Sequence, residues 1–141
     1  MSGPSSVLFA CNYNTVRSPM AAALLRARGG DLRVDSCGLF GDGEAVDGFA
    51  LAVLAEVGVT LDGHEAKSFA VVQDAPFDLV ISLTPEAHAR TLALKKDPAT
   101  VAECWPIEDP TVEQGARDLR LDAYRRVRDE LTQRIEERFP A

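Results

Sequence analysis

The sequence contains few cysteines, few histidines and no long apolar run. Its 141 residues include three Cys and two His, without a Cys-x-x-Cys pair or the Cys/His spacing of a metal site. We therefore expect no metal and no cofactor, and free thiols in a reducing compartment. No apolar run reaches the roughly 18 residues of a membrane span, and the first six residues, MSGPSS, lack a signal-peptide pattern. These observations predict a cytoplasmic protein without membrane contact.

Basic residues are also scarce relative to acidic ones. Fifteen Lys and Arg against 22 Asp and Glu give a net charge of −7, which argues against a nucleic-acid-binding surface. Any anion must therefore be bound by a local arrangement of donors and not by the overall charge. The apolar fraction of 46% is sufficient for a hydrophobic core, and the length fits a single domain over residues 1–141.

The stretch 7–20, VLFACNYNTVRSPM, has the pattern of a strand, a loop and the start of a helix. Residues 7–10 are apolar, which is typical of a buried parallel strand. A short polar loop then runs from Cys11 to Ser18. Ser18 precedes Pro19 and a run of strong helix formers, which predicts a helix from Pro19 to about Arg28 with Ser18 as its N-cap.

A loop between a strand end and a helix N-terminus favours anions through its backbone N–H groups and the helix dipole. The same donors favour a thiolate at Cys11, the first residue of the loop. The guanidinium of Arg17, six residues later, can hold two oxygens of a tetrahedral oxyanion. A Cys-x5-Arg-Ser/Thr pattern is expected by chance roughly 0.03 times in a chain of this composition. A nucleophile beside a cationic clamp predicts phosphoryl transfer through a cysteinyl-phosphate.

The loop follows the pattern C-x-x-N-x-x-R-S-P, given by Cys11, Asn14, Arg17, Ser18 and Pro19. In this pattern, and in its position after the first strand, the chain resembles the low-molecular-weight protein tyrosine phosphatase family, which includes thioredoxin-linked arsenate reductases. The resemblance implies a phosphomonoester hydrolase with a cysteine nucleophile. The residues predicted to surround the phosphate are Asn12, Tyr13, Asn14, Thr15, Val16, Arg17 and Ser18.

The resemblance also implies supporting residues further along the chain. In the segment 35–38, DSCG, Ser36 is expected to bond Asn14 and hold the geometry of the loop. Phe40 is expected to form a wall of the substrate cleft. The segment 64–67, HEAK, matches a His-x-Ala-Arg/Lys pattern of the family, to which we assign a structural role.

The rest of the chain alternates strands with helices. Further strands are expected at residues 32–37, 77–84 and 101–105, and helices at 48–57, 85–96 and 117–139. The last helix should turn one face to the core, formed by Leu121, Tyr124, Val127, Leu131 and Ile135. This alternation predicts an α/β fold, a single three-layer domain with a four-stranded parallel sheet and helices on both faces. The loop at Cys11 then lies at the carboxyl ends of the strands, where ligands bind.

Asp109-Pro110 lies between the fourth expected strand and the last helix. Pro110 restricts Asp109 to an extended backbone, and a carboxylic acid at a strand's carboxyl end can protonate a leaving oxygen. The family carries its general acid in an Asp-Pro at this point of the chain, so the resemblance implies that role for Asp109. The predicted catalytic residues are Cys11, Arg17, Ser18 and Asp109, with Pro110 in support.

The sequence departs from the family pattern at several positions. Typical phosphatases of the family read C-L-G-N-I-C-R-S, whereas this chain has Asn12, Tyr13 and Val16. Residues 111–112, Thr-Val, replace the aromatics that usually follow Asp-Pro. Because aromatic walls hold a phosphotyrosine ring by stacking, ring recognition would depend on Tyr13 and Phe40.

We predict a phosphatase that acts on a phosphorylated protein or a small aryl phosphate and binds phosphate, arsenate or vanadate. One alternative is an arsenate reductase that uses an external thiol. The thioredoxin-linked members of the family carry a resolving Cys pair near the third strand, but residues 77–96 of this chain contain no Cys. Whether Cys37 or Cys104 approaches Cys11 stays open. The other alternative is a non-catalytic oxyanion-binding regulatory module, which Asn12 and Tyr13 permit but the paired nucleophile and acid argue against.

Overall fold

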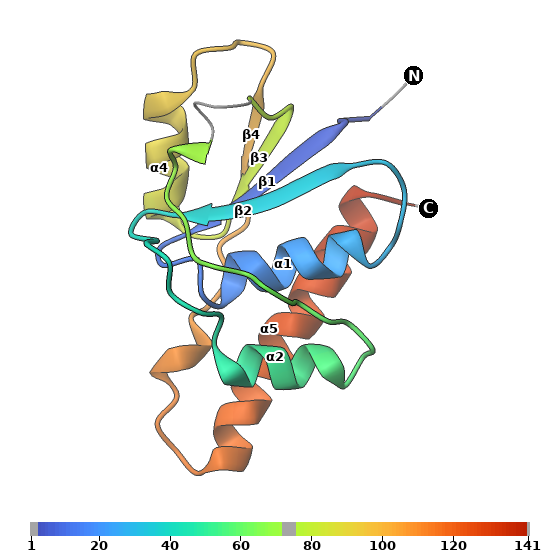
Figure 1. Cartoon of the computed structure of the whole chain (residues 1–141), viewed down its shortest axis with the longest axis vertical. Helices are drawn as coiled ribbons and strands as arrows, with labels where there is room; N and C mark the ends of the chain where they lie inside the picture. The colour runs from blue at the N-terminus through green and yellow to red at the C-terminus, as the bar shows by residue number, and fades with distance from the viewer. Residues whose placement is uncertain (1–2, 72–75, 141) are drawn as a thin grey trace.

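The computed structural model describes residues 3–71 and 76–140 of the chain, and strands and helices alternate along it (Figure 1). The strands are β1 (Ser6–Cys11), β2 (Arg33–Gly38), β3 (Leu79–Ser82) and β4 (Val101–Cys104). The helices are α1 (Arg17–Arg26), α2 (Gly48–Ala55), α4 (Pro85–Leu94), the 3-10 helix η1 (Pro110–Val112) and α5 (Arg117–Arg138). Within the described ranges, no helix combines the length and the apolarity needed to cross a bilayer.

The four strands form one parallel sheet in the order β2-β1-β3-β4. Strand β1 is buried along its whole length, as a continuous apolar run in a parallel sheet predicts. Because β2 lies on one side of β1 and β3 on the other, the strand order reverses beside the carboxyl end of β1. Ligands of open α/β sheets bind at such a point. The predicted four-stranded parallel sheet, with the Cys11 loop after the first strand, is confirmed.

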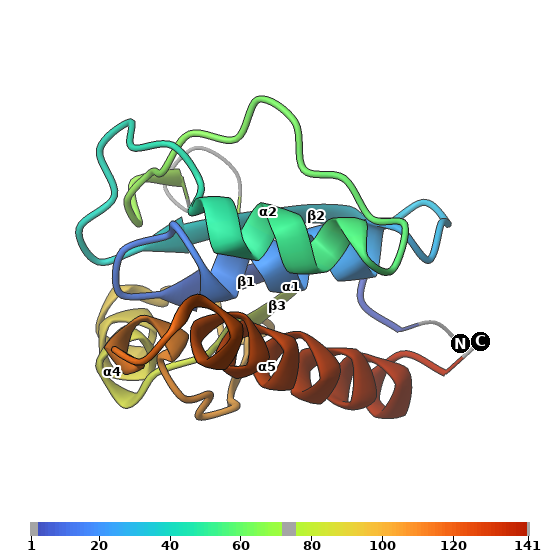
Figure 2. The ribbon, with the colours of Figure 1, turned by 90° about the horizontal axis from the view of Figure 1, so that it is seen from below.

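Helices cover both faces of the sheet, with α1, α2 and α5 on one face and α4 on the other (Figures 1 and 2). The side chains of Val7, Phe9 and Cys11 belong to the core shared with α1, α2 and α5. Leu8 and Ala10 alternate with them and belong to the cluster on the α4 side. The inward face predicted for α5 is buried at all five positions, Leu121, Tyr124, Val127, Leu131 and Ile135.

Helix α1 begins at Arg17, two residues before the predicted start at Pro19. Its N-cap is Val16, which makes no side-chain cap hydrogen bond, so the prediction of Ser18 as N-cap was wrong. The Oγ of Ser18 instead lies 2.9 Å from Sγ of Cys11, which takes the hydroxyl away from any capping role. Pro19 still falls in the first helical turn, where the absent N–H leaves no hydrogen bond unmade.

Several other boundaries shift by a few residues. Helix α2 begins after its N-cap Asp47, whose carboxylate accepts from the N–H groups of Phe49 and Ala50. Val57, the last residue of the helix expected over 48–57, lies outside α2 and is 50% exposed, because α2 ends at Ala55 and the chain turns at Gly58 with a φ of 75°. Strand β3 is shorter than predicted at both ends.

Glu56, directly after α2, binds two arginines of α5. Its carboxylate accepts hydrogen bonds of 2.7–3.2 Å from Arg125 and one of 2.8 Å from Arg128. These donors, Arg125 first, lower the pKa of Glu56 from 4.5 to about 2. Because this pKa is lower in the folded chain, the resulting stabilisation is present above the ordinary pKa. It is lost as the pH falls from about 4.5 toward 2.

We therefore expect Glu56→Gln to lower the melting temperature at pH 7 and to lower it less at pH 3, as followed by circular dichroism. Glu137→Gln is the control, since Glu137 is an exposed side chain of α5 that forms no ion pair within the described residues. It should leave the melting temperature unchanged at both pH values. An equal loss at pH 7 and pH 3 for Glu56→Gln would contradict the electrostatic origin.

Candidate active site

The sulfur of Cys11 lies at the end of β1 with two hydrogen-bonding groups beside it. Oγ of Ser18 is 2.9 Å from Sγ, and the backbone N–H of Asn14 donates to Sγ over 3.3 Å. Nδ2 of Asn14 donates to Oγ of Ser18 over 2.8 Å, so the serine oxygen already accepts one hydrogen bond. Its own hydrogen can go to Sγ or to the carbonyl of Cys37, 3.2 Å away. A thiolate at Cys11 would draw that hydrogen to the sulfur, because charged acceptors bind more strongly.

Asn14 anchors the loop from several sides. Its φ of 59° is left-handed, a conformation that Asn tolerates better than most residues. Nδ2 donates to Oγ of Ser36 over 3.0 Å, and Oδ1 accepts from the backbone N–H of Lys67 over 3.0 Å. Nε2 of His64 lies 2.9 Å from the Asn14 carbonyl, and that nitrogen must carry the hydrogen because a carbonyl only accepts. The hydrogen bond between Ser36 and Asn14 that the resemblance implies is therefore present.

Gly38, the last residue of β2, lies against the backbone of the loop. A Cβ at this position would be 2.8 Å from the backbone N of Asn14 and 2.9 Å from the carbonyl oxygen of Asn12. Backbone atoms cannot move aside as a flexible side chain can, so only glycine allows this approach. The N–H of Phe40 then donates to the Asn12 carbonyl over 2.9 Å, which ties the end of β2 to the loop.

Arg17 connects the loop to the segment that carries Asp109. Its side chain is 11% exposed, its Nη1 donates to the carbonyl of Ile107 over 2.9 Å, and its Nη2 lies 4.0 Å from Oδ2 of Asp109. The other carboxylate oxygen, Oδ1, accepts from the N–H and Oγ1 of Thr111 at 3.0 and 2.6 Å. Pro110 is buried and begins η1. The structure thus brings Arg17 and Asp109 together from distant parts of the chain.

Asn12 is fixed by a residue that sequence reasoning did not include in the site. The hydroxyl of Thr84 donates to Oδ1 of Asn12 over 2.8 Å and accepts from the N–H of Ala87 over 3.0 Å as the N-cap of α4. This contact joins the carboxyl ends of β1 and β3 at the reversal of strand order. Thr84 before Pro85 indicates a helix N-cap in the sequence, but no local pattern reveals its long-range partner.

The remaining loop residues differ in their surroundings. The rings of Tyr13 and Phe40 pack with centroids 5.5 Å apart, and the two residues are 59% and 61% exposed. Val16 is buried in the core below the loop. The carbonyl of Thr15 accepts from the N–H of Asp47 over 2.9 Å, which connects the loop to the start of α2.

The other two cysteines do not share the surroundings of Cys11. Cys37 pairs with Ala10 in the sheet and lies in the cluster on the α4 side, whereas Cys11 lies in the opposite core. Burial, followed by the nearby Cys11 and Asp35, raises the pKa of the Cys37 thiol far above its usual value, so it stays protonated. Cys104, in β4, is half-buried and close to the carbonyl of Thr84. All three are free thiols.

Comparisons with known proteins agree with this geometry. The model of a family described as low molecular weight phosphotyrosine protein phosphatase matches residues 6–139. The chain belongs to this family.

Relatives of the chain include both phosphatases and arsenate reductases. A low molecular weight protein-tyrosine-phosphatase of Streptomyces coelicolor is 37% identical over 135 residues, covering 87% of this chain and 80% of the relative. A glutaredoxin arsenate reductase of Synechocystis sp. is 30% identical over 131 residues and covers 92% of both chains. The crystal structure of a low molecular weight protein tyrosine phosphatase from T. tengcongensis superposes with a TM-score of 0.79 at 27% identity, covering 94% of this chain and 95% of that one. Family membership makes the chain an enzyme of the phosphatase class.

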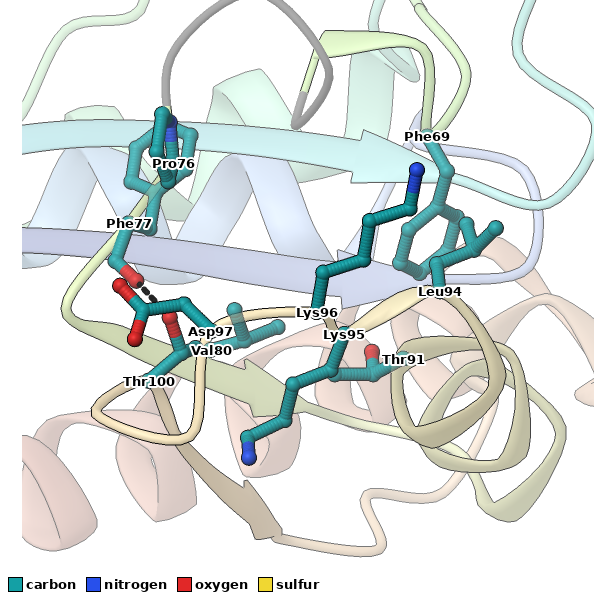
Figure 3. Close-up of a pocket in the computed structure, with 10 residues that line it drawn as sticks. All are labelled: Phe69, Pro76, Phe77, Val80, Thr91, Leu94, Lys95, Lys96, Asp97 and Thr100. Carbon is teal, nitrogen blue, oxygen red and sulfur yellow. Dashed lines mark hydrogen bonds between the residues drawn. The ribbon is translucent and has the colours of Figure 1, made fainter.

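A cavity of about 570 Å³ lies apart from the phosphatase loop, between β3 and the end of α4 (Figure 3). Phe69, Phe77 and Leu94 contribute apolar walls, and Lys95 and Lys96 extend in different directions from the end of α4. None of the residues that line it belongs to the loop or to the Asp109 segment. The cavity therefore does not take part in the candidate active site.

We expect Gly38→Ala to lower kcat/KM for an aryl phosphate by about tenfold or more, because its Cβ would displace the loop backbone that positions the nucleophile. Gly48→Ala is the matched control, since nothing lies within 4 Å of a Cβ at Gly48. Steady-state kinetics, with melting temperatures to monitor folding, would measure both variants. If Gly38→Ala folds and retains full kcat/KM, the close approach of β2 does not matter for the site.

Proposed function

We propose that the protein is a cysteine-dependent phosphatase that hydrolyses aryl phosphate monoesters, including phosphotyrosine in proteins. The observation that carries the proposal is the convergence of three groups at the end of β1. Oγ of Ser18 and the N–H of Asn14 lie within hydrogen-bonding distance of Sγ of Cys11, and Arg17, at the other end of the same loop, lies 4.0 Å from Asp109. A nucleophile, a cation and a carboxyl group are the three groups that phosphoryl transfer to a cysteine requires.

In the first step, the Cys11 thiolate attacks phosphorus in line and the bond between phosphorus and the aryl oxygen breaks. Asp109, as the carboxylic acid, gives its proton to that leaving oxygen. Arg17 and the backbone N–H groups of the loop, other than that of Asn14, which donates to Sγ, bind the equatorial oxygens, where charge is spread in the transition state. The products of this step are a phenol and a cysteinyl-phosphate.

In the second step, the Asp109 carboxylate takes a proton from water, and the resulting oxygen nucleophile attacks phosphorus. The bond between phosphorus and sulfur breaks, which releases inorganic phosphate and restores the Cys11 thiolate. The hydroxyl of Ser18 donates to the departing sulfur and stabilises its charge. Its fixed position, held by Nδ2 of Asn14 at 2.8 Å, supports this role.

Tyr13 and Phe40 support an aromatic leaving group in this proposal. Their rings pack against each other and are more than half exposed beside the loop. An aryl ring bound against such a wall gains stacking energy and buries apolar surface. Phosphate, arsenate and vanadate should compete for the same loop, since all three are tetrahedral oxyanions. The three free thiols fit a reducing environment, and we propose a cytoplasmic location.

Arsenate reduction with an external thiol is a second candidate, favoured by the similarity to the Synechocystis arsenate reductase. Cys37 is buried on the opposite face of the sheet and Cys104 lies at its edge, in β4. Neither thiol is placed in the core that contains Cys11. A reductase built on this site would therefore need a thiol from another molecule to resolve an arseno-cysteine.

We expect Cys11→Ser to abolish turnover of p-nitrophenyl phosphate and phenyl phosphate in the presence of reductant. Asp109→Asn should lower the rate of phenyl phosphate hydrolysis by roughly 10²–10⁴-fold, the usual contribution of a general acid. The same substitution should lower the rate of p-nitrophenyl phosphate hydrolysis less, because p-nitrophenolate leaves without needing a proton. Asp31→Asn, an exposed aspartate before β2, is the control and should behave as wild type.

Normal turnover by the Cys11→Ser protein would disprove the covalent mechanism. An equal effect of Asp109→Asn on both esters would remove Asp109 from the role of general acid. If the wild-type protein hydrolyses neither ester but reduces arsenate when glutathione and glutaredoxin are added, the second candidate replaces the first.

A further inference from the structure

Two arginines at the start of α5 stack on one aromatic ring of α2. The guanidinium carbon of Arg120 lies 4.7 Å from the centroid of the Phe49 ring, and that of Arg117 lies 5.8 Å from it. Both arginines are exposed. Figure 1 shows the start of α5, in orange, beside the start of α2. The ring thus holds two cationic groups at one place on the surface.

These two arginines differ from the other five of α5. Arg125, Arg126, Arg128, Arg134 and Arg138 each form an ion pair, whereas none of the ion pairs within residues 3–71 and 76–140 includes Arg117 or Arg120. Asp118 follows Arg117 directly, but adjacent residues of a helix do not face each other. Cations in a first helical turn are also opposed by the helix dipole. Helix stability therefore does not explain this pair.

A chain of contacts connects the pair to the loop of the candidate active site. Phe49 packs on Tyr124 with centroids 5.3 Å apart, and the Tyr124 hydroxyl donates to Asp47 over 3.0 Å. The N–H of Asp47 then donates to the carbonyl of Thr15 in the loop over 2.9 Å. Burial, followed by Asp47, raises the pKa of Tyr124; Asp109 raises it further and Arg120 lowers it. Helix α5 also packs against η1, the 3-10 helix that directly follows Asp109.

We propose that Arg117 and Arg120 form an anion subsite that binds acidic side chains next to the phosphorylated residue of a protein substrate. The inference rests on the proposed phosphatase function and adds a substrate class to it. Arg17 is buried, and the proposed mechanism assigns it to the phosphate. Arg117 and Arg120 are exposed and lack carboxylate partners in the described chain. Because the protein carries a net charge of −7, an acidic substrate segment would otherwise be repelled.

The test compares two peptides of equal length that contain phosphotyrosine, one with glutamates around it and one with glutamines in their place. The ratio of kcat/KM for the acidic peptide to that for the neutral one should be about five- to tenfold for wild type at low salt, since exposed ion pairs are individually weak. It should fall toward one at high salt. Arg117→Gln with Arg120→Gln should reduce the ratio to about one.

Arg90→Gln is the matched control, because Arg90 is an exposed arginine of α4 with no ion pair in the described residues. It should leave the ratio at the wild-type value. A wild-type ratio near one, or a double variant that keeps the wild-type ratio, would overturn the subsite.

Hydrolysis of p-nitrophenyl phosphate by the same wild-type preparation separates this result from the proposed function. If that ester is hydrolysed while the peptide ratio is one, the phosphatase function stands and the subsite is wrong. If wild type hydrolyses neither the ester nor the peptides, both proposals fail.

Discussion

The hydrogen bonds of Asn14 are the constraint on which the site depends. A left-handed residue in the middle of a loop turns the backbone so that its N–H meets Sγ of Cys11 at 3.3 Å. The side chain then fixes Ser18 and Ser36, which come from α1 and β2. Removing the amide would take away the partner of Oγ of Ser36 and of the N–H of Lys67, at a cost of about 1–3 kcal/mol for each. The loop geometry and the position of the Cys11 sulfur are therefore stabilised by the same bonds.

Arg17 imposes a second constraint, because it serves two segments at once. It begins α1, so its backbone is fixed by the helix, and its Nη1 is fixed by a hydrogen bond to the carbonyl of Ile107. The remaining donors of the guanidinium can reach Asp109 on one side and an oxyanion on the other. Binding of an oxyanion would compete with Asp109 for the same cation. In the mechanism proposed above, protonated Asp109 relieves that competition in the first step.

Structural features that depend on residues close together in the sequence could be predicted from it, whereas contacts between residues far apart in the sequence could not. The buried run before Cys11, the loop spacing up to Arg17 and the apolar face of α5 are local patterns, and the four-stranded parallel sheet follows from them. The assignment of Ser18 as an N-cap was wrong, because a serine before a proline is a typical N-cap pattern although its hydroxyl lies against Sγ of Cys11. The contacts of Thr84 with Asn12 and of Ile107 with Arg17 depend on the packing of β3 and β4 around β1.

The distribution of charge around the loop follows from the net charge of the chain. A protein with seven excess negative charges repels a phosphorylated substrate over the screening length, about 8–10 Å at physiological salt. Within that distance, the attraction between single positively charged side chains and the substrate can outweigh this repulsion. In the proposed mechanism Arg17 would bind the phosphate, and its burial would strengthen that interaction. The cations stacked on Phe49 lie at the surface, where an interaction is weaker but can distinguish one substrate sequence from another.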